Sequence, residues 1–238
     1  MNNIQFENET FLLNTQTLEY SVQQMFCLDF WKKEKRILGH AKGRGITWFL
    51  KSADLFGVDT ALRHYYRGGL IGKLNRDLFL YTDEHKTRSF AEFNLLKRLH
   101  ELGLAVPKPI AARMQKVGGI FYRADILLEK IDGASDLTVL LKTSLPELVW
   151  ERIGQEIKKL HQAQVNHRDL NCHNILIQSG TEKIYLIDFD KCAIESGERW
   201  KEENLLRLKR SFEKEKQRMG IVFDDACWMY LLKGYERV

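Results

Sequence analysis

The residues with the clearest chemical potential lie between positions 167 and 190. The tripeptide His-Arg-Asp at 167–169 is followed by Asn174, five residues after Asp169, and Asp188 comes after a short apolar stretch. Phosphoryl transfer needs a carboxylate beside the attacking hydroxyl and oxygen ligands that hold magnesium between the nucleotide phosphates. The spacing therefore predicts Asp169 as the catalytic base or orienting carboxylate, with Asn174 and Asp188 as magnesium ligands.

The elements around these residues favour the same chemistry. Apolar residues recur at helical spacing over 148–160 behind Pro146, and two apolar runs within 175–190 flank a turn at Ser179-Gly180. A helix, a loop and a hairpin in this order resemble the context of the H-R-D-x-x-x-x-N and D-F-G loops of kinases. A lone His-x-Asp is common by chance, but the combination favours a catalytic site. We expect His167 to anchor the loop.

The first half of the chain has a different pattern. Segments 46–50, 59–66 and 77–82 have the composition of antiparallel strands and alternate with glycine clusters at 43–45 and 68–72. One helix is predicted from Arg88 until Gly103 stops it. We interpret 118–125 and 126–131 as a second hairpin that ends at the turn Asp132-Gly133.

These patterns predict an α+β chain with a two-lobed, protein-kinase-like fold. Residues 1–131 would form an N-terminal nucleotide-binding lobe, a small antiparallel sheet with one helix. Residues 132–238 would form a mainly helical catalytic lobe, and the two would make one kinase domain.

The N-terminal half offers candidates for ATP binding. Gly43 and Gly45 lie before the strand at 46–50 and could cover the phosphates, although they depart from G-x-G-x-x-G and an ordinary loop is the alternative. Arg63 stands where the kinase V-A-I-K pattern has lysine, and Glu92 on the helix could pair with it. His64 or Arg67 could be the phosphate-binding cation instead.

The composition fits a compact globular domain. Apolar residues make up 44% of the 238, and 37 Lys and Arg against 32 Asp and Glu leave a net charge of +5. This apolar content excludes a disordered or fibrous chain, and the charge mildly favours an anionic partner. The four cysteines are too far apart to spell out a zinc or redox pair. No signal peptide or membrane-spanning segment is evident, so we expect a cytosolic protein or one attached to a membrane from the cytosolic side.

The acceptor is expected to be small. Asn171 lacks the lysine that serine/threonine protein kinases have at this position, Asp190 replaces the glycine of D-F-G, and no A-P-E segment follows. Only 48 residues remain after Asp190, too few for a full peptide-docking lobe. A small-molecule or glycolipid hydroxyl is therefore the favoured acceptor.

A more specific resemblance rests on five strings, LRHYYRGG (62–69), LHELGLAVPKPIAAR (99–113), HRDLNCHNILI (167–177), LIDFDKC (186–192) and NLLRLKRSFEKEK (204–216). They resemble the 3-deoxy-D-manno-octulosonic acid (Kdo) kinases of lipopolysaccharide assembly, from about Gly43 to the end of the chain. The resemblance implies phosphorylation of the 4-hydroxyl of Kdo on a lipid A precursor, with ATP and Mg²⁺, at the cytoplasmic face of the bacterial inner membrane. The catalytic aspartate would be Asp169.

A lipid-linked acceptor suggests peripheral attachment to an anionic membrane surface. Residues 207–218 hold six basic and two acidic side chains, and 31–36 place four bases beside Trp31. The alternative is an ordinary solvated helix face with Leu205, Leu208 and Phe212 in the core. Nothing indicates nucleic-acid binding or an obligate protein partner.

Three other functions stay open at this stage. The chain could phosphorylate a heptose-bearing lipopolysaccharide, or a soluble alcohol in the manner of aminoglycoside or choline kinases. It could also be a catalytically inactive kinase fold that binds a partner or a membrane. The joint presence of Asp169, Asn174 and Asp188 argues against the last possibility, because a binding module needs none of them.

Overall fold

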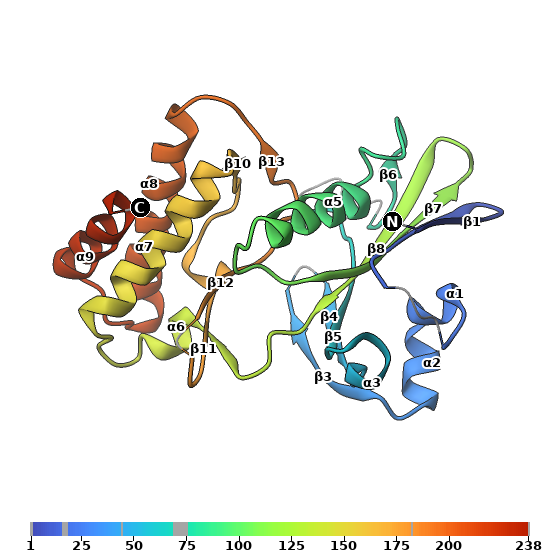
Figure 1. Cartoon of the computed structure of the whole chain (residues 1–238), viewed down its shortest axis with the longest axis horizontal. Coiled ribbons are helices and arrows are strands. Elements are labelled where there is room, and N and C mark those ends of the chain that lie inside the picture. The colour runs from blue at the N-terminus through green and yellow to red at the C-terminus, as the bar shows by residue number, and fades with distance from the viewer. Residues whose placement is uncertain (1, 16–18, 44, 69–75, 182, 238) are drawn as a thin grey trace. The chain divides into compact units, whose positions relative to one another are not determined.

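The computed structural model describes residues 2–15, 19–43, 45–68, 76–181 and 183–237 (Figure 1). Contacts between residues divide the chain into two compact units. The first comprises Met1–Lys97 and Lys108–Lys130, and the second Arg98–Pro107 and Ile131–Val238. The segment Arg98–Pro107, which we had assigned to the first lobe from the sequence, therefore groups with the second.

A mainly antiparallel sheet dominates the first unit. Its strands run in the order β1-β2-β7-β8-β5-β4-β3, and β6 also pairs with β8. The strands are β1 (Asn2–Phe6), β2 (Glu9–Leu13), β3 (Ile37–Lys42), β4 (Ile46–Leu50), β5 (Thr60–His64), β6 (Phe79–Leu80), β7 (Pro109–Val117) and β8 (Phe121–Glu129). β4 and β8 flank β5 on either side, so the strand that carries Arg63 lies inside the sheet.

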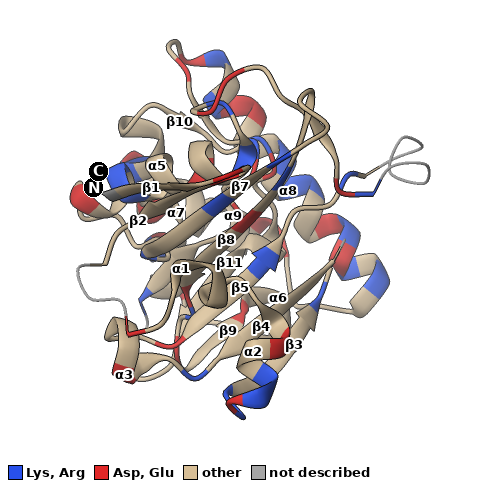
Figure 2. Ribbon diagram, turned by 90° about the vertical axis from the view of Figure 1, so that its right-hand side faces the viewer, with Lys and Arg blue, Asp and Glu red and all other residues tan. Residues whose placement is uncertain are grey.

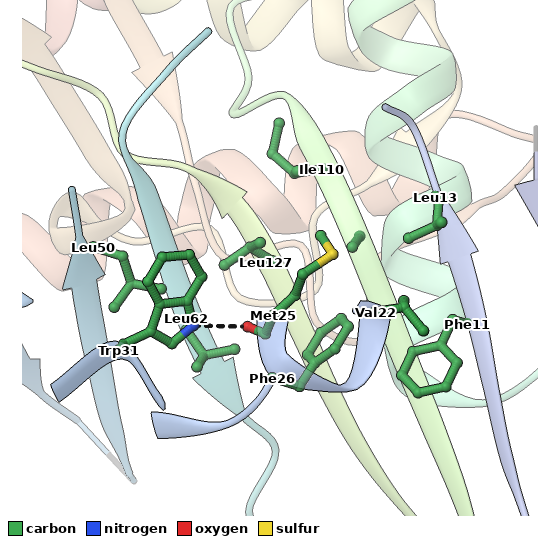
Figure 3. Packing of buried hydrophobic residues seen from close by; sticks show 11 residues of the cluster. Phe11, Leu13, Val22, Met25, Phe26, Trp31, Leu50, Leu62, Ile110 and Leu127 are labelled. Atoms are coloured by element: carbon green, nitrogen blue, oxygen red, sulfur yellow. Dashed lines mark hydrogen bonds between the residues drawn. The ribbon is translucent and has the colours of Figure 1, made fainter. Parts of the chain in front are cut away.

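Helices cover both faces of this sheet. On one face α1 (Val22–Met25), its C-cap residue Phe26 and α2 (Leu28–Lys33) contribute Met25, Phe26 and Trp31 to a buried cluster with strand residues that include Leu62 and Leu127 (Figure 3). The indole Nε1 of Trp31 donates to the Met25 carbonyl at 3.0 Å. The short helix α3 (Ala53–Phe56) adds Leu55 and Phe56 at the edge of the same cluster.

The helix α5 (Arg88–Glu101) packs on the opposite face. Phe90 and Phe93 are fully buried there with residues such as Tyr65 and Ile126. Because successive side chains of a strand point to opposite faces, β5 directs Leu62 toward α1 and α2 and Arg63 toward α5. This alternation brings Arg63 to the helix that carries Glu92.

The second unit is mainly helical. Its helices are α6 (Leu137–Leu140), α7 (Glu147–Gln162), the 3₁₀ helix η1 (Cys172–Asn174), α8 (Arg199–Met219) and α9 (Asp225–Glu236). β11 (Ile175–Gln178) pairs with β12 (Ile184–Leu186) and β9 (Ala134–Asp136), and β10 (Val165–Asn166) pairs with β13 (Ala193–Ile194). The two small sheets flank the loop that contains Asp169.

Aromatic rings fill the space between α7 and α8. Trp150 lies 5.4 Å from Phe212 and 5.8 Å from Phe223, ring centroid to ring centroid. α7 and α9 cross where Gly154 meets Gly234, and a Cβ on either glycine would overlap backbone of the other helix, at Leu231 or Glu151. None of the helices in the described part of the chain is long and apolar enough to cross a membrane.

The strands predicted at 46–50 and 59–66, the helices and the hairpin within 175–190 are confirmed. The predicted hairpin within 118–131 is wrong. Gly118 and Gly119, with φ of 59° and 80°, form the turn between β7 and β8, and β8 then continues unbroken through Ile126. The segment 77–82 forms only the two-residue strand β6, and residues 69–72 of the predicted glycine cluster at 68–72 lie outside the described residues.

Candidate active site

The loop at 167–174 is fixed by a fully buried histidine. The ring of His167 donates from Nε2 to the Ile187 carbonyl at 3.1 Å and packs against Phe189, 5.0 Å between centroids. Burial lowers the pKa of His167, although the carbonyl of Ile187 and the nearby carboxylates oppose that effect. A neutral imidazole thus ties the loop to the segment carrying Asp188, as expected from the sequence.

The helix α8 supports the same loop through two polar side chains. The backbone N–H of His167 donates to Asn204 Oδ1 at 3.1 Å, and Asn204 Nδ2 donates to Asn166 Oδ1 at 2.8 Å. Farther along, the backbone N–H of Cys172 donates to Ser211 Oγ at 3.0 Å. We did not predict these residues from the sequence. Asn204 could have been noticed, because it is a polar residue on the apolar side of the helix, four positions before Leu208.

Asp169, Asn174 and Asp188 line one open pocket of about 380 Å³ within the second unit. Asn171 and Asn174 each donate from Nδ2 to the Asp169 carbonyl at 2.9 Å, which holds both ends of the loop together. Asp188 adopts a left-handed conformation with φ of 63°, which aspartate tolerates better than most residues. The structure therefore brings the three predicted residues to the same place.

The donor set at this pocket fits magnesium. Asn174 uses its amide nitrogen on the Asp169 carbonyl, so the amide oxygen is the atom left to serve as a ligand. This oxygen and the carboxylate of Asp188 are hard ligands of the kind Mg²⁺ binds together with phosphate oxygens and water. The described residues contain no cluster of three His, Cys, Asp or Glu that could hold a metal ion.

The remaining pocket wall comes from α8 and η1. It comprises Asn171, His173, Ser211, Lys214, Glu215 and Arg218. His173 Nδ1 lies 3.1 Å from Asp136 Oδ2, and its Nε2 lies 3.6 Å from Glu215 Oε1. From the sequence we had placed Lys214 and Arg218 in a basic stretch for membrane contact. Their position in the pocket could not be deduced without knowing which face of α8 meets the loop.

In the first unit Arg63 forms a double contact with Glu92. Arg63 Nη2 lies 2.6 Å from Oε1 and 2.5 Å from Oε2 of Glu92, whose side chain is 1% exposed. Tyr65 donates its hydroxyl to Glu92 Oε2 at 2.6 Å, and its ring lies beneath the Arg63 guanidinium. The ion pair expected between β5 and the helix is present, while its part in ATP binding stays a prediction.

The alternative candidates for the phosphate-binding cation, His64 and Arg67, have other partners. His64 points away from α5, and its two ring nitrogens lie 2.7 Å from Asp125 and 3.3 Å from Asp77. Burial alone would lower the pKa of His64, but hydrogen bonds and charge from Asp125 and Asp77 raise it. Arg67 stacks over Phe79. Of the three candidates, Arg63 is the one that contacts Glu92.

Gly43 and Gly45 form the tip of the hairpin between β3 and β4. Gly43 N–H donates to the Gly45 carbonyl at 2.8 Å, and a Cβ on Gly45 would overlap the ring of Tyr66. Arg44 lies outside the described residues. β4 pairs with β5 so that Thr47 is opposite Arg63. The glycine tip and the candidate cation thus belong to one three-stranded segment of the sheet.

Comparison with known proteins identifies related sequences. The model of the lipopolysaccharide kinase (Kdo/WaaP) family matches residues 28–235. A 3-deoxy-D-manno-octulosonic acid kinase of Pasteurella multocida is 55% identical over 97% of both chains. One of Haemophilus influenzae strain 86-028NP is 53% identical over 100% of both, and one of Photobacterium profundum is 45% identical over 99% of this chain and 98% of its own.

A solved structure described as WaaP in complex with acyl carrier protein has the same fold. The TM-score is 0.59 at 18% sequence identity, with 93% of this chain and 88% of the other covered. The predicted protein-kinase-like fold is consistent with this match, and at such low identity the likeness concerns the fold alone.

We predict that Glu92→Ala lowers the free energy of unfolding by about 3 kcal/mol, because it leaves the largely buried guanidinium of Arg63 without its carboxylate. Tyr65→Phe removes one hydrogen bond to the same carboxylate and should cost about 1 kcal/mol. Urea denaturation measures both. Equal midpoints for wild type and Glu92→Ala would contradict a structural role for the pair.

Proposed function

Since the chain belongs to the lipopolysaccharide kinase (Kdo/WaaP) family, we propose that it phosphorylates the Kdo sugar of a Kdo-lipid A precursor with ATP in lipopolysaccharide core biosynthesis. The observation that carries the proposal is the similarity over the full chain to enzymes named Kdo kinases, at 53–55% identity. The convergence of Asp169, Asn174 and Asp188 in one pocket supplies the chemistry such a reaction needs.

The proposed mechanism centres on Asp169. Its carboxylate orients the acceptor hydroxyl, which is the 4-hydroxyl of Kdo by family resemblance, and takes its proton as attack proceeds. A bond forms between the sugar oxygen and the γ-phosphorus of ATP, and the bond from that phosphorus to the bridging oxygen of ADP breaks. The hydrogen bonds from Asn171 and Asn174 to the Asp169 carbonyl keep the carboxylate in position.

Asn174 and Asp188 would hold magnesium, which when bound neutralises charge on the transferring phosphates. In the first unit, Glu92 fixes the Arg63 guanidinium so that it can serve as the cation for nucleotide phosphates. The tip at Gly43 and Gly45 would cover those phosphates.

The alternative acceptors would use the same catalytic residues. A heptose-bearing lipopolysaccharide or a soluble alcohol places a hydroxyl beside the same carboxylate, so the choice of Kdo rests on the names of the relatives. An inactive kinase fold is disfavoured, because His167, Asn204 and Ser211 hold the loop in an arrangement that a binding module does not require.

We further propose that the protein docks on an anionic membrane at the cytoplasmic face of the inner membrane, through α8. Figure 2 shows basic segments along this helix, and Arg207 and Arg210 are exposed beside Leu206, which is 47% exposed. Bases near acidic headgroups contribute about 1 kcal/mol each. Trp31, beside the second basic stretch, is buried, and so are Leu208 and Phe212, which the alternative interpretation had assigned to the core.

We predict that Asp169→Ala lowers turnover of Kdo-lipid A precursor about 10²-fold or more, because the acceptor hydroxyl loses its orienting base. Transfer of labelled phosphate from ATP to the lipid measures the rate, and circular dichroism checks folding. Asp225→Asn, whose side chain is 94% exposed on α9, is the matched control and should remain active. Near-normal turnover in Asp169→Ala would rule out the assigned role.

We predict that Asp188→Asn raises the magnesium concentration needed for half-maximal activity, because a neutral amide is a weaker ligand than a carboxylate. A magnesium titration of the kinase rate measures this at saturating ATP. A curve that superimposes on the wild-type curve would exclude Asp188 as a ligand.

We predict that Arg207→Ala/Arg210→Ala weakens binding to vesicles of anionic phospholipid about tenfold or more, since two bases near the headgroups are lost. Cosedimentation with anionic and with neutral vesicles measures the affinity, and Arg199→Ala on the same helix serves as control. Equally poor wild-type binding to both vesicle types would disprove docking by charge.

A further inference from the structure

One face of α8 forms a wall of the pocket that contains Asp169. Its four pocket-lining residues follow the spacing i, i+3, i+4, i+7 and are Ser211, Lys214, Glu215 and Arg218. Residues at this spacing lie above one another on a single helix face. Two of the four are basic, so the wall opposite the catalytic loop carries cations.

The other two wall residues have structural partners. Ser211 Oγ accepts from the Cys172 N–H at 3.0 Å and donates to the Leu208 carbonyl at 2.7 Å. The Glu215 side chain is 5% exposed, and its carboxylate lies between His173 and Arg218. These contacts attach α8 to the loop, which leaves Lys214 and Arg218 to face a ligand.

Arg218 lies beside the Glu215 carboxylate and is open to solvent. Its Nε lies 3.2 Å from Glu215 Oε2, an ion-pair distance without a hydrogen bond, while 62% of the Arg218 side chain is exposed. An exposed guanidinium at this place is suited to bind a second carboxylate or a phosphate through paired hydrogen bonds.

Lys214 lies one turn before Arg218 and is exposed. In the described portion of the chain, no carboxylate lies within ion-pair distance of Lys214. The ammonium group is therefore a charge on the pocket wall that no acidic side chain compensates.

The pocket also places a constraint on the acceptor. The proposed acceptor is the sugar of an octulosonic acid, which carries a carboxylate at neutral pH. Asp169 and Asp188 line the same pocket, and two like charges 4 Å apart repel by about 4 kcal/mol at an effective dielectric constant of 20. An acidic sugar therefore needs cations beside its carboxylate before its hydroxyl can approach Asp169.

From this geometry we infer that Lys214 and Arg218 bind the carboxylate of the acceptor sugar and so select an acidic sugar over a neutral one. The inference rests on the proposed function and deepens it. Both bases line a pocket of about 380 Å³, which suits one sugar rather than a bilayer surface. The membrane-facing residues Arg207 and Arg210 are not among the residues of this pocket.

The test compares Lys214→Ala and Arg218→Ala with wild type in full kinetic analysis. Each substitution should raise KM for Kdo-lipid A precursor at least about tenfold, because that is the effect of losing one hydrogen bond to a charged group. KM for ATP should stay unchanged. Arg199→Ala, a basic residue of the same helix that is 93% exposed, should match wild type. Unchanged KM for the acceptor in both pocket variants would overturn the inference while leaving the kinase activity established.

Two acceptor analogues identify the anion. If the carboxylate is the ligand, esterifying the Kdo carboxyl raises KM of the wild type and abolishes the difference between wild type and variants. A difference that disappears instead when the lipid phosphates are removed would assign the bases to phosphate and overturn the carboxylate assignment. Melting temperatures within the range of wild type show that the variants are folded.

A binding measurement separates this inference from the proposed function. Calorimetric titration of free Kdo into wild type and into Lys214→Ala/Arg218→Ala needs no turnover. Tighter binding to wild type supports the inference, whether or not a Kdo acceptor is phosphorylated. Absence of phosphorylation would refute only the proposed function. Equal affinities would overturn the inference whatever the turnover.

Discussion

The hydrogen bond from His167 to the Ile187 carbonyl holds together the two segments that carry Asp169 and Asp188. Asp169 follows this histidine by two residues, and Asp188 follows the carbonyl by one. Neither segment forms regular secondary structure of its own at these positions. The distance between Asp169 and Asp188 therefore depends on the contact between the two segments. Full burial keeps the imidazole neutral, and a neutral ring can donate to the carbonyl without leaving an isolated charge in the core.

The helix α8 has two roles. Asn204 and Ser211 hold the 167–174 loop through its backbone N–H groups, and Ser211 with the residues one or two turns farther along lines the pocket. Because both sets belong to one rigid helix, the position of the pocket wall is tied to that of the loop. A single strand of the first unit also serves two contacts. In β5, Arg63 contacts Glu92, and the next residue, His64, contacts Asp125.

The local features of the site could be predicted from the sequence. Asp169, Asn174 and Asp188 stand out because a loop and a hairpin of fixed length bring them together. The error at 118–131 arose because strand patterns do not show whether β8 is one strand or two until its partner β7 is known. Likewise, the charge pattern of 207–218 indicated a basic helix but not which bases face the pocket. β1 and β2 were missed because β2 joins the sheet by pairing with β7, about a hundred positions away, and β1 pairs with β2.

The crossing of α7 and α9 restricts how this sequence can diverge. At most helix contacts, a larger residue on one side can be accommodated by a smaller one on the other, so the two positions can change in turn. Gly154 and Gly234 already have no side chain, and each Cβ would meet backbone rather than a side chain that could shrink. No single compensating substitution is available to either position. Divergence at this point therefore requires the helices themselves to move apart.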